Sequence, residues 1–195
     1  MRIGVIADTH LPSIIRSVDQ LGPQLGELLE PCDLILHAGD VTAPSVIDWC
    51  EQFAPTWIAR GNNDLFEHAN LSDRHLFERC GWRFALVHEL RPESRPMDEL
   101  LRDATDGEPV DVLIAGDTHV ERLEYRDGVL LLNPGSPTLP HHKEYRLGTA
   151  AVLEVSAKRI DAKVHVLGHS EGAPNPGRVL SLVVDRDGTG AQLEC

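Results

Sequence analysis

The stretch GVIADTH, residues 4–10, decides the fold, because an apolar run ends there on polar side chains. Strands buried on both faces of a parallel sheet are nearly continuous apolar runs, and residues 3–7 have that composition. Asp8 and His10 follow directly, and both carry atoms that can bind a metal ion. We therefore predict a buried strand with chemically active side chains at its carboxyl end.

Length, composition and charge narrow the class of protein. The chain has 195 residues, enough for one domain with its own core, so we predict a single domain over residues 1–195. Hydrophobic residues make up 42% and charged residues 25%, as in ordinary globular proteins. The formal net charge of −13 argues against long duplex nucleic acid as a partner, because binding a phosphate backbone needs clustered lysines and arginines.

Cysteine spacing and the amino-terminal segment bear on the cellular location. The cysteines lie far apart without a C-x-x-C pair, which favours reduced structural thiols over a zinc or redox motif; they are Cys32, Cys50, Cys80 and Cys195. The apolar run at residues 3–7 is too short for a signal peptide core or a membrane span. We expect a cytoplasmic protein that does not insert into membranes.

The first third of the chain alternates between strand and helix patterns. A helical pattern over residues 17–30, weakened by Gly22 and Pro23, leads to a strand at 34–36. A second helix over 43–53 has Thr42 as its expected N-cap and Pro44 in its first turn, and a strand begins at residue 56. This order predicts βαβ units and a partly parallel sheet, whose polar strand ends meet at one edge.

The rest of the chain adds antiparallel elements. Residues 75–89 are typical of two strands about a Cys-Gly turn, and a helix over 96–105 and a strand over 110–119 follow. A hairpin turns over Asp127 and Gly128, and further antiparallel strands are expected within 145–155, 159–169 and 178–194. A two-sheet α/β sandwich fits this pattern better than a single doubly wound sheet.

Five apolar segments end at side chains that can ligate a metal: Asp8, His10, Asp40, Asn62, His88, Asp117 and His119. Each alone is more simply explained as a turn former, a helix cap or an ordinary histidine. The predicted sheet brings them to one edge, where nitrogen and oxygen donors without a thiolate favour Mn, Fe or Zn. Two such ions sharing a carboxylate would activate a water for attack on phosphorus.

The order of these motifs resembles the calcineurin-like metallophosphoesterases, in particular their YfcE-like small phosphodiesterase branch. The motifs are DTH at 8–10, GD at 39–40, GNND at 61–64, VH at 87–88, GDTH at 116–119 and NPGS at 133–136, whereas residues 156–195 match none. The resemblance implies a four-layer α/β/β/α sandwich of two mixed sheets. It also implies a metal-dependent phosphoesterase, a phosphodiesterase acting on a small phosphate ester or nucleotide.

The family pattern also implies roles for the site residues. One divalent ion would be held by Asp8, His10 and His119, and a second by Asn62, His88 and Asp117. Asp40 would bridge the two ions, and a metal-bridging hydroxide would be the nucleophile. The residues expected to carry catalysis are then Asp40, Asn62 and His88.

The sequence departs from the family pattern at three places. Asp117 stands where the family usually has histidine; it keeps an oxygen donor, but its charge is expected to weaken phosphate binding. Glu89 and Leu90 follow His88 where branch members often have Gly-His. Asn63 stands where larger relatives carry a general-acid histidine, so esters with leaving groups that depart unaided should be preferred.

Other residues and an alternative function complete these expectations. We interpret Asp64 as a supporting residue, NPGS as a tight turn and His37 as a strand residue near the site, while His141 and His142 are either exposed or close to a substrate phosphate. The scaffold also resembles the retromer subunit of vacuolar sorting, so a non-catalytic interaction scaffold is the alternative. Relatives often form dimers, so a homodimer is a further implied partner.

Overall fold

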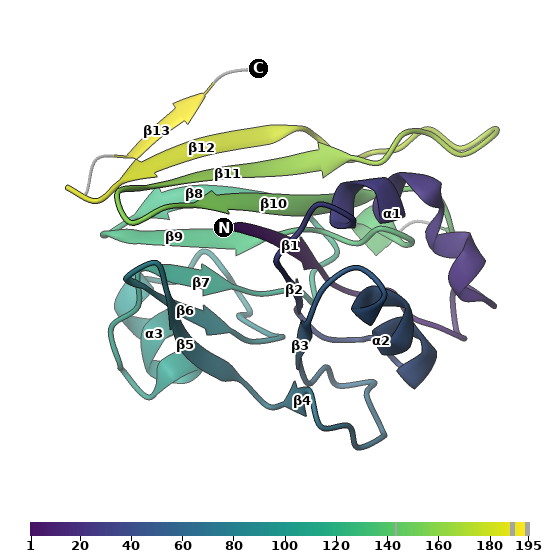
Figure 1. Ribbon diagram of the computed structural model, residues 1–195, viewed down its shortest axis with the longest axis horizontal. Coiled ribbons are helices and arrows are strands. Elements are labelled where there is room, and N and C mark those ends of the chain that lie inside the picture. The colour runs from purple at the N-terminus through teal and green to yellow at the C-terminus, as the bar shows by residue number, and fades with distance from the viewer. Residues whose placement is uncertain (143, 188–189, 194–195) are drawn as a thin grey trace.

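Two β-sheets packed face to face, with helices outside both, form the protein (Figure 1). The computed structural model describes residues 1–142, 144–187 and 190–193. Helices α1 (Pro23–Leu29) and α2 (Pro44–Glu51) cover the outer face of one sheet, and α3 (Met97–Thr105) covers the outer face of the other. The predicted α/β/β/α sandwich is therefore confirmed.

The larger sheet has the strand order β13-β12-β11-β10-β1-β2-β3-β4. Its parallel part follows the predicted alternation and consists of β1 (Arg2–Ile6), β2 (Leu34–His37), β3 (Thr56–Ala59) and β4 (Leu71–Ser72). Its antiparallel part is the expected carboxyl-terminal series β10 (Thr149–Val155), β11 (Arg159–Val166), β12 (Leu180–Asp185) and β13 (Gly190–Leu193). The sheet is thus mixed, and its parallel part contains the motif-bearing strands β1 to β3.

The smaller sheet has the strand order β5-β6-β7-β9-β8. Its strands are β5 (His75–Arg79), β6 (Trp82–Leu86), β7 (Val112–Ile114), β8 (Arg122–Arg126) and β9 (Val129–Asn133). β6, β7 and β9 run parallel, while β5 and β8 form the two predicted hairpins at the edges. The strands that precede the VH and GDTH motifs, β6 and β7, are therefore neighbours in this sheet.

Burial on both faces explains the continuous apolar runs in the central strands. On β1, Ile3 and Val5 point into the core between the sheets, whereas Ile6 packs beneath α1 and α2. All three side chains are fully buried. On β7, Ile114 faces the inter-sheet core and Leu113 faces α3. Each of these strands thus buries one face against the other sheet and the opposite face against helices.

Local details differ from the sequence prediction in the first third of the chain. The helix expected over 17–30 is divided into a 3₁₀ turn, Val18–Leu21, and α1, because Gly22 between them has a φ of 81°. The predicted N-cap is wrong by one residue: Ala43 precedes α2. Thr42 has a φ of 63° and its N–H is bound by Asp64, so it belongs to the site loop. Pro44 does begin the helix, as predicted.

Two further observations concern the cysteines and the helices. Cys32, Cys50 and Cys80 are free, while Cys195 lies outside the described residues. Within the described part of the chain, no helix combines the length and apolar character needed to cross a bilayer.

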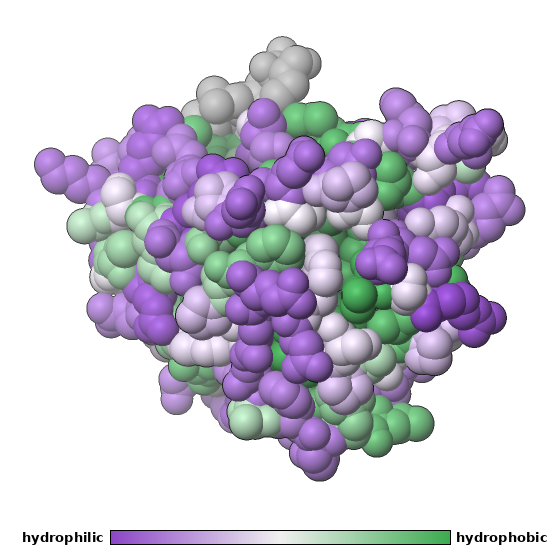
Figure 2. Space-filling model, turned by 45° about the vertical axis from the view of Figure 1, so that its right-hand side comes forward, coloured by the Kyte–Doolittle hydropathy of each residue, from purple (hydrophilic) through white to green (hydrophobic). Residues whose placement is uncertain are grey.

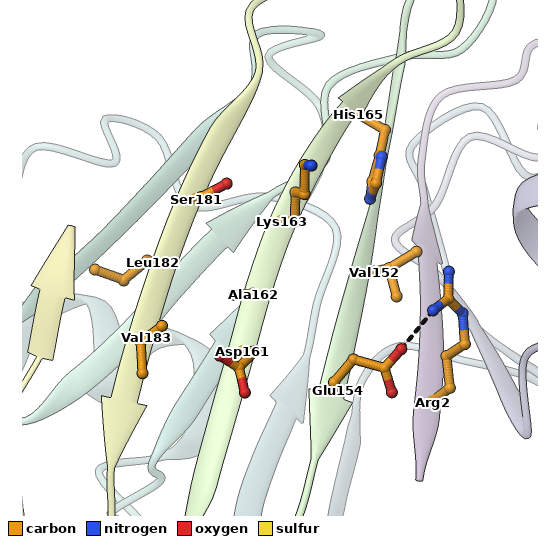
Figure 3. Close-up of a pocket in the computed structure, with 10 residues that line it drawn as sticks. All are labelled: Arg2, Val152, Glu154, Asp161, Ala162, Lys163, His165, Ser181, Leu182 and Val183. Carbon is orange, nitrogen blue, oxygen red and sulfur yellow. Dashed lines mark hydrogen bonds and ion pairs between the residues drawn. The ribbon is translucent and has the colours of Figure 1, made fainter. Parts of the chain in front are cut away.

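A hollow lies on the outer surface, away from the polar strand ends. Figure 2 shows hydrophilic residues over much of one face, with hydrophobic ones in small groups between them. A hollow of about 380 Å³ lies on the outer face of β10–β12, where the ion pair of Arg2 with Glu154 borders it together with Lys163 and His165 (Figure 3). It contains none of the predicted site residues.

Candidate metal centre

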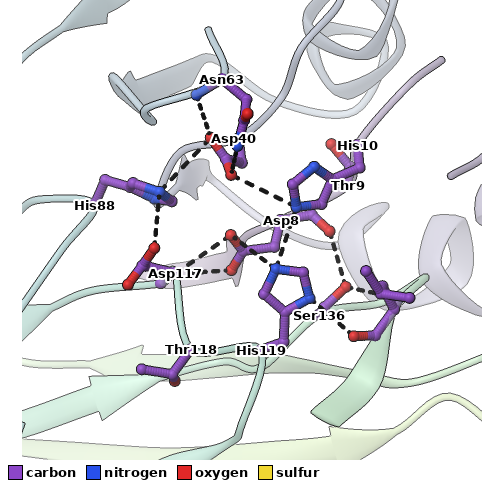
Figure 4. A network of polar contacts seen from close by, with 12 residues as sticks. Asp8, Thr9, His10, Asp40, Asn63, His88, Asp117, Thr118, His119 and Ser136 are labelled. Atoms are coloured by element: carbon purple, nitrogen blue, oxygen red, sulfur yellow. Dashed lines mark hydrogen bonds and ion pairs between the residues drawn. The ribbon is translucent and has the colours of Figure 1, made fainter. Parts of the chain in front are cut away.

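The predicted ligands come together at the carboxyl ends of strands from both sheets (Figure 4). The loops after β1, β2 and β3 supply the residues from the larger sheet, and those after β6 and β7 supply the rest. A pocket of about 230 Å³ opens there; the predicted residues lining it are His10, Asp40, Asn62, Asp117 and His119. An oxygen of Asp8 is 3.6 Å from His119 Nε2, and His88 Nε2 is 3.6 Å from an oxygen of Asp40, so the structure brings all seven predicted residues into one cluster.

Two groups within this cluster have the geometry to hold a metal ion. In the first, formed by Asp8, His10 and His119, one ligand atom from each residue lies within 4.8 Å of the others. In the second, the same holds for Asp8, Asp40 and His88. The two groups therefore share Asp8, whereas sequence motifs had suggested Asp40 as the shared carboxylate.

The Asp40 carboxylate nevertheless lies between the two groups. Its Oδ2 is 3.6 Å from His10 Nε2, and its Oδ1 is 3.6 Å from His88 Nε2. Asn63 holds both oxygens, since its backbone N–H donates to Oδ1 at 2.9 Å and its amide Nδ2 donates to Oδ2 at 2.7 Å. Asn63, considered from sequence only as a missing acid, is thus an anchor for Asp40.

Hydrogen bonds orient two of the imidazoles. His88 Nδ1 is 2.7 Å from the carbonyl oxygen of Ala38, and His119 Nδ1 is 2.9 Å from that of Leu139. Because a carbonyl only accepts, both rings must carry their hydrogen on Nδ1. The Nε2 lone pairs therefore point into the cluster, which is the arrangement found in histidine ligands of metals.

Burial favours the neutral forms of His10 and His119 and makes the carboxylate charge costly. Burial lowers the pKa of His10, and that of His119 to about 4. Asp8 is fully buried, and burial together with the charge of Asp40 raises its pKa well above the usual value. Among the described residues, no lysine or arginine pairs with Asp8 or Asp40. A divalent cation would relieve this repulsion, so the residues present fit such an ion.

Asp117 lies at the margin of the cluster, outside both groups. One of its carboxylate oxygens is 3.7 Å from His88 Nε2, and the other pairs with the guanidinium of Arg91. Burial raises the pKa of Asp117, while His88 and Arg91 oppose the shift. That Asp117 ligates a metal stays a prediction. Arg91 was missed from sequence, although it comes three residues after His88 in the same loop.

Asn62 and Asp64 of the GNND motif have different surroundings, because Asn62 is exposed and Asp64 is buried. Asn62 is exposed, and its Oδ1 lies 3.1 Å from His88 Nε2 at the mouth of the pocket. Asp64 is buried and accepts the backbone N–H groups of Asp40, Thr42 and Gly61. Its expected supporting role is confirmed, because it ties the loop after β2 to the loop after β3.

The backbone of the ligand loops is unusual. Positive φ angles between 53° and 67° occur at Asp8, His10, Asp40, Asp117 and His119. Non-glycine residues rarely adopt this left-handed region, and such strain concentrates at functional sites. Gly39, with a φ of 91°, lies against the ring of His88 so closely that a Cβ atom would overlap it. The loops are therefore shaped to aim side chains inward.

The NPGS motif forms the expected turn and supports the loops beneath the pocket. Asn133 Nδ2 donates to the Gly116 carbonyl at 2.8 Å, and Ser136 Oγ donates to the Asp8 carbonyl at 2.8 Å. His142 stacks on His119 with ring centroids 4.1 Å apart and lines the pocket, whereas His141 Nε2 is 2.7 Å from a Glu121 oxygen. Of the two loop histidines, His142 is thus the one at the site.

His37 is a strand residue next to the site, as expected from its position before Gly39. It is fully buried, and its Nε2 lies 3.2 Å from the Thr9 hydroxyl. Burial lowers the pKa of His37 to about 3. The residue is therefore neutral across the physiological range and lies outside both metal-binding groups.

The family follows from comparison with known proteins. Residues 1–158 match the model of the calcineurin-like phosphoesterase superfamily domain. The chain belongs to this superfamily. This calcineurin-like chain is 33% identical over 165 residues to a probable metallophosphoesterase of Methanothermobacter thermautotrophicus, covering 84% of the chain and 91% of that relative. The resemblance drawn from the motifs is confirmed.

Two further relatives bear on the function of this calcineurin-like chain. It is 28% identical over 150 residues to a phosphodiesterase of Methanocaldococcus jannaschii, covering 69% of the chain and 83% of the relative. The solved structure of Vps29 from Chaetomium thermophilum has a TM-score of 0.76 at 21% identity, covering 94% of this chain and 96% of that one. At that identity the likeness to Vps29 shows the fold alone.

Proposed function

We propose that the protein is a metal-dependent phosphodiesterase that hydrolyses a small phosphate ester or nucleotide with two divalent ions. The observation that carries the proposal is the pair of buried donor groups that share Asp8, with Asp40 between their histidines. Membership of the phosphoesterase superfamily and similarity to a phosphodiesterase support it. The donor chemistry favours manganese, iron or zinc.

Each residue has a defined role in this proposal. Asp8, His10 and His119 would hold one ion, His88 would hold the other with Asn62 and Asp117, and Asp40 would serve both. Divalent ions bound there would supply Lewis acidity for activating a water molecule and for drawing charge from the phosphoryl oxygens. Asn63 keeps both oxygens of Asp40 in place through its two hydrogen bonds. The set expected to carry catalysis remains Asp40, Asn62 and His88.

Asn63 offers the leaving group no proton. Asn63, at the mouth of the pocket, has no proton that titrates near neutral pH. Esters whose leaving groups depart as stable anions, such as nitrophenolates, should therefore be hydrolysed faster than alkyl esters. This preference is the same as the one expected from sequence.

The alternative function is a non-catalytic interaction scaffold, and the likeness of the fold to Vps29 favours it. Six predicted ligands other than Asp117 are present with their donor atoms facing one another, which favours the enzyme. We propose a cytoplasmic location, supported by the free thiols of Cys32, Cys50 and Cys80. A homodimer and a small phosphate ester are the proposed partners, and the net charge of −13 disfavours long duplex nucleic acid.

Metal content and hydrolysis, measured together, test the proposal. Protein purified without added metal is analysed by plasma mass spectrometry, and hydrolysis of bis-(p-nitrophenyl) phosphate is assayed with Mn²⁺, Fe²⁺, Zn²⁺ or Mg²⁺. We expect close to two ions per chain, metal-stimulated hydrolysis, and loss of both in Asp40→Ala. The variant Asp73→Ala is the control, because that carboxylate is 93% exposed. An absence of bound ions and of hydrolysis with every metal would favour the scaffold.

A further inference from the structure

Arg91 is the arginine of the metal-site pocket. Among the described residues that line this pocket, Arg91 is the one with a permanent positive charge. It lies in the loop between β6 and α3, and 54% of its side chain is exposed. No motif identified from the sequence includes it.

Arg91 holds Asp117 at two points. Its Nε pairs with the carboxylate, and its Nη2 donates to the Asp117 carbonyl oxygen at 3.2 Å. Both contacts are to the same residue and hold the guanidinium beside Asp117. Within the described part of the chain, Nη1 donates no hydrogen bond. A cation held beside Asp117, with Nη1 unused, therefore borders the pocket.

The pair also changes the charge of the site. Three carboxylates, those of Asp8, Asp40 and Asp117, lie in the cluster, and Arg91 neutralises the third. Asp117 together with Arg91 thus carries the same net charge as a neutral imidazole at position 117. This opposes the weakening of phosphate binding that Asp117 by itself would cause.

We propose that Arg91 is a specificity-determining residue that donates from Nη1 to a non-bridging oxygen of the substrate's phosphoryl group while it holds Asp117. The inference rests on the proposed function and deepens it. A guanidinium presents its N–H groups in a planar fork suited to phosphate oxygens, and charge-assisted hydrogen bonds of this kind are strong. Arg91 therefore selects substrates with an anionic phosphoryl group that reaches this side of the pocket.

The test compares Arg91→Met and Arg91→Lys with the control Arg102→Met. Arg102 lies on α3, is 67% exposed, and pairs only loosely with Asp98 at 3.5 Å. Binding of inorganic phosphate to the Mn²⁺-loaded protein is measured by calorimetry, Mn²⁺ stoichiometry by mass spectrometry, and KM and kcat with bis-(p-nitrophenyl) phosphate. We expect Arg91→Met to weaken phosphate binding and raise KM by about 10- to 100-fold. Mn²⁺ stoichiometry should be kept, Arg91→Lys should be intermediate, and Arg102→Met should match wild type.

A second background separates phosphate binding from the ion pair with Asp117. In Asp117→His, Arg91 has no carboxylate to neutralise, so a purely compensating arginine could be replaced by methionine without loss of phosphate affinity. We expect Arg91→Met to weaken phosphate binding in that background as well. Unchanged phosphate affinity there, or in Arg91→Met alone at full Mn²⁺ stoichiometry, overturns the role of Arg91 only. Wild-type protein that binds neither Mn²⁺ nor phosphate overturns the proposed function too.

Discussion

Replacement of Asp64 should show how far the ligand loops depend on one buried carboxylate. Its Oδ2 accepts the N–H groups of Asp40 at 3.0 Å and Gly61 at 2.8 Å, and its Oδ1 accepts that of Thr42 at 2.7 Å. Each buried donor left without a partner costs about 1–3 kcal/mol. Asp64→Ala removes all three bonds, and partial rehydration of the vacated space makes about 3–5 kcal/mol the expected loss in unfolding free energy. Asp64→Asn can keep the Oδ2 pair and should lose about 1–3 kcal/mol.

The assay is urea unfolding of the metal-free protein, followed by Mn²⁺ titration and hydrolysis of bis-(p-nitrophenyl) phosphate well below the unfolding midpoint. Because Asp64 positions the backbone of Asp40 and the residue before Asn62, we expect Mn²⁺ affinity or activity to fall by about 10- to 100-fold. The exposed Asp73→Ala should lie within about 0.5 kcal/mol of wild type. An Asp64→Ala variant as stable and active as Asp73→Ala would refute the reasoning.

Three more outcomes follow from the structure. Gly39→Ala should abolish Mn²⁺ binding and lower the unfolding free energy by more than about 2 kcal/mol, because the added Cβ would overlap His88. The control is Gly107→Ala, where φ is 84° and the surrounding space is open. It should lower the unfolding free energy by only about 1 kcal/mol, as measured by thermal unfolding. The pKa of His37 is about 3 in the folded protein and 6.5 in the unfolded chain. Its contribution to the free energy of unfolding is therefore complete above pH 6.5 and is about 2 kcal/mol smaller at pH 5. His37→Gln should remove this pH dependence of the unfolding free energy, measured by urea unfolding with chelator. The same pH dependence in both proteins would contradict the assigned burial. Mn²⁺ at about 1,000 times its Kd should stabilise the wild-type protein by about 4 kcal/mol in thermal unfolding. Chelator should reverse this gain, and Asp40→Ala should show none.

Most strands were predictable because their signal is local. A strand buried on both faces must be apolar at nearly every position, and residues 3–7 and 34–36 meet that condition. The two-residue strand β4 was not predicted, because so short a segment carries no periodicity. Thr42 was assigned as an N-cap on residue type, but the distant Asp64 binds its N–H and draws it into the site loop.

The candidate site was predictable where a ligand follows an apolar strand. His10 and His119, separated by more than a hundred residues, were placed together because both follow parallel strands. The roles of Asn63 and Arg91 were missed, and for His142 two alternatives were left open, because each acts through a contact with a side chain that no spacing predicts.

The sequence by itself determined the two-sheet architecture and the identity of the donors, since apolar runs and the residues that end them are properties of neighbouring positions. The tertiary structure alone decided that Asp8 belongs to both donor groups, that Asn63 anchors Asp40, and that Arg91 neutralises Asp117. The physical reason is that charge and hydrogen bonding act over a few ångströms in space. Loops that are distant in sequence come that close only when both sheets have packed.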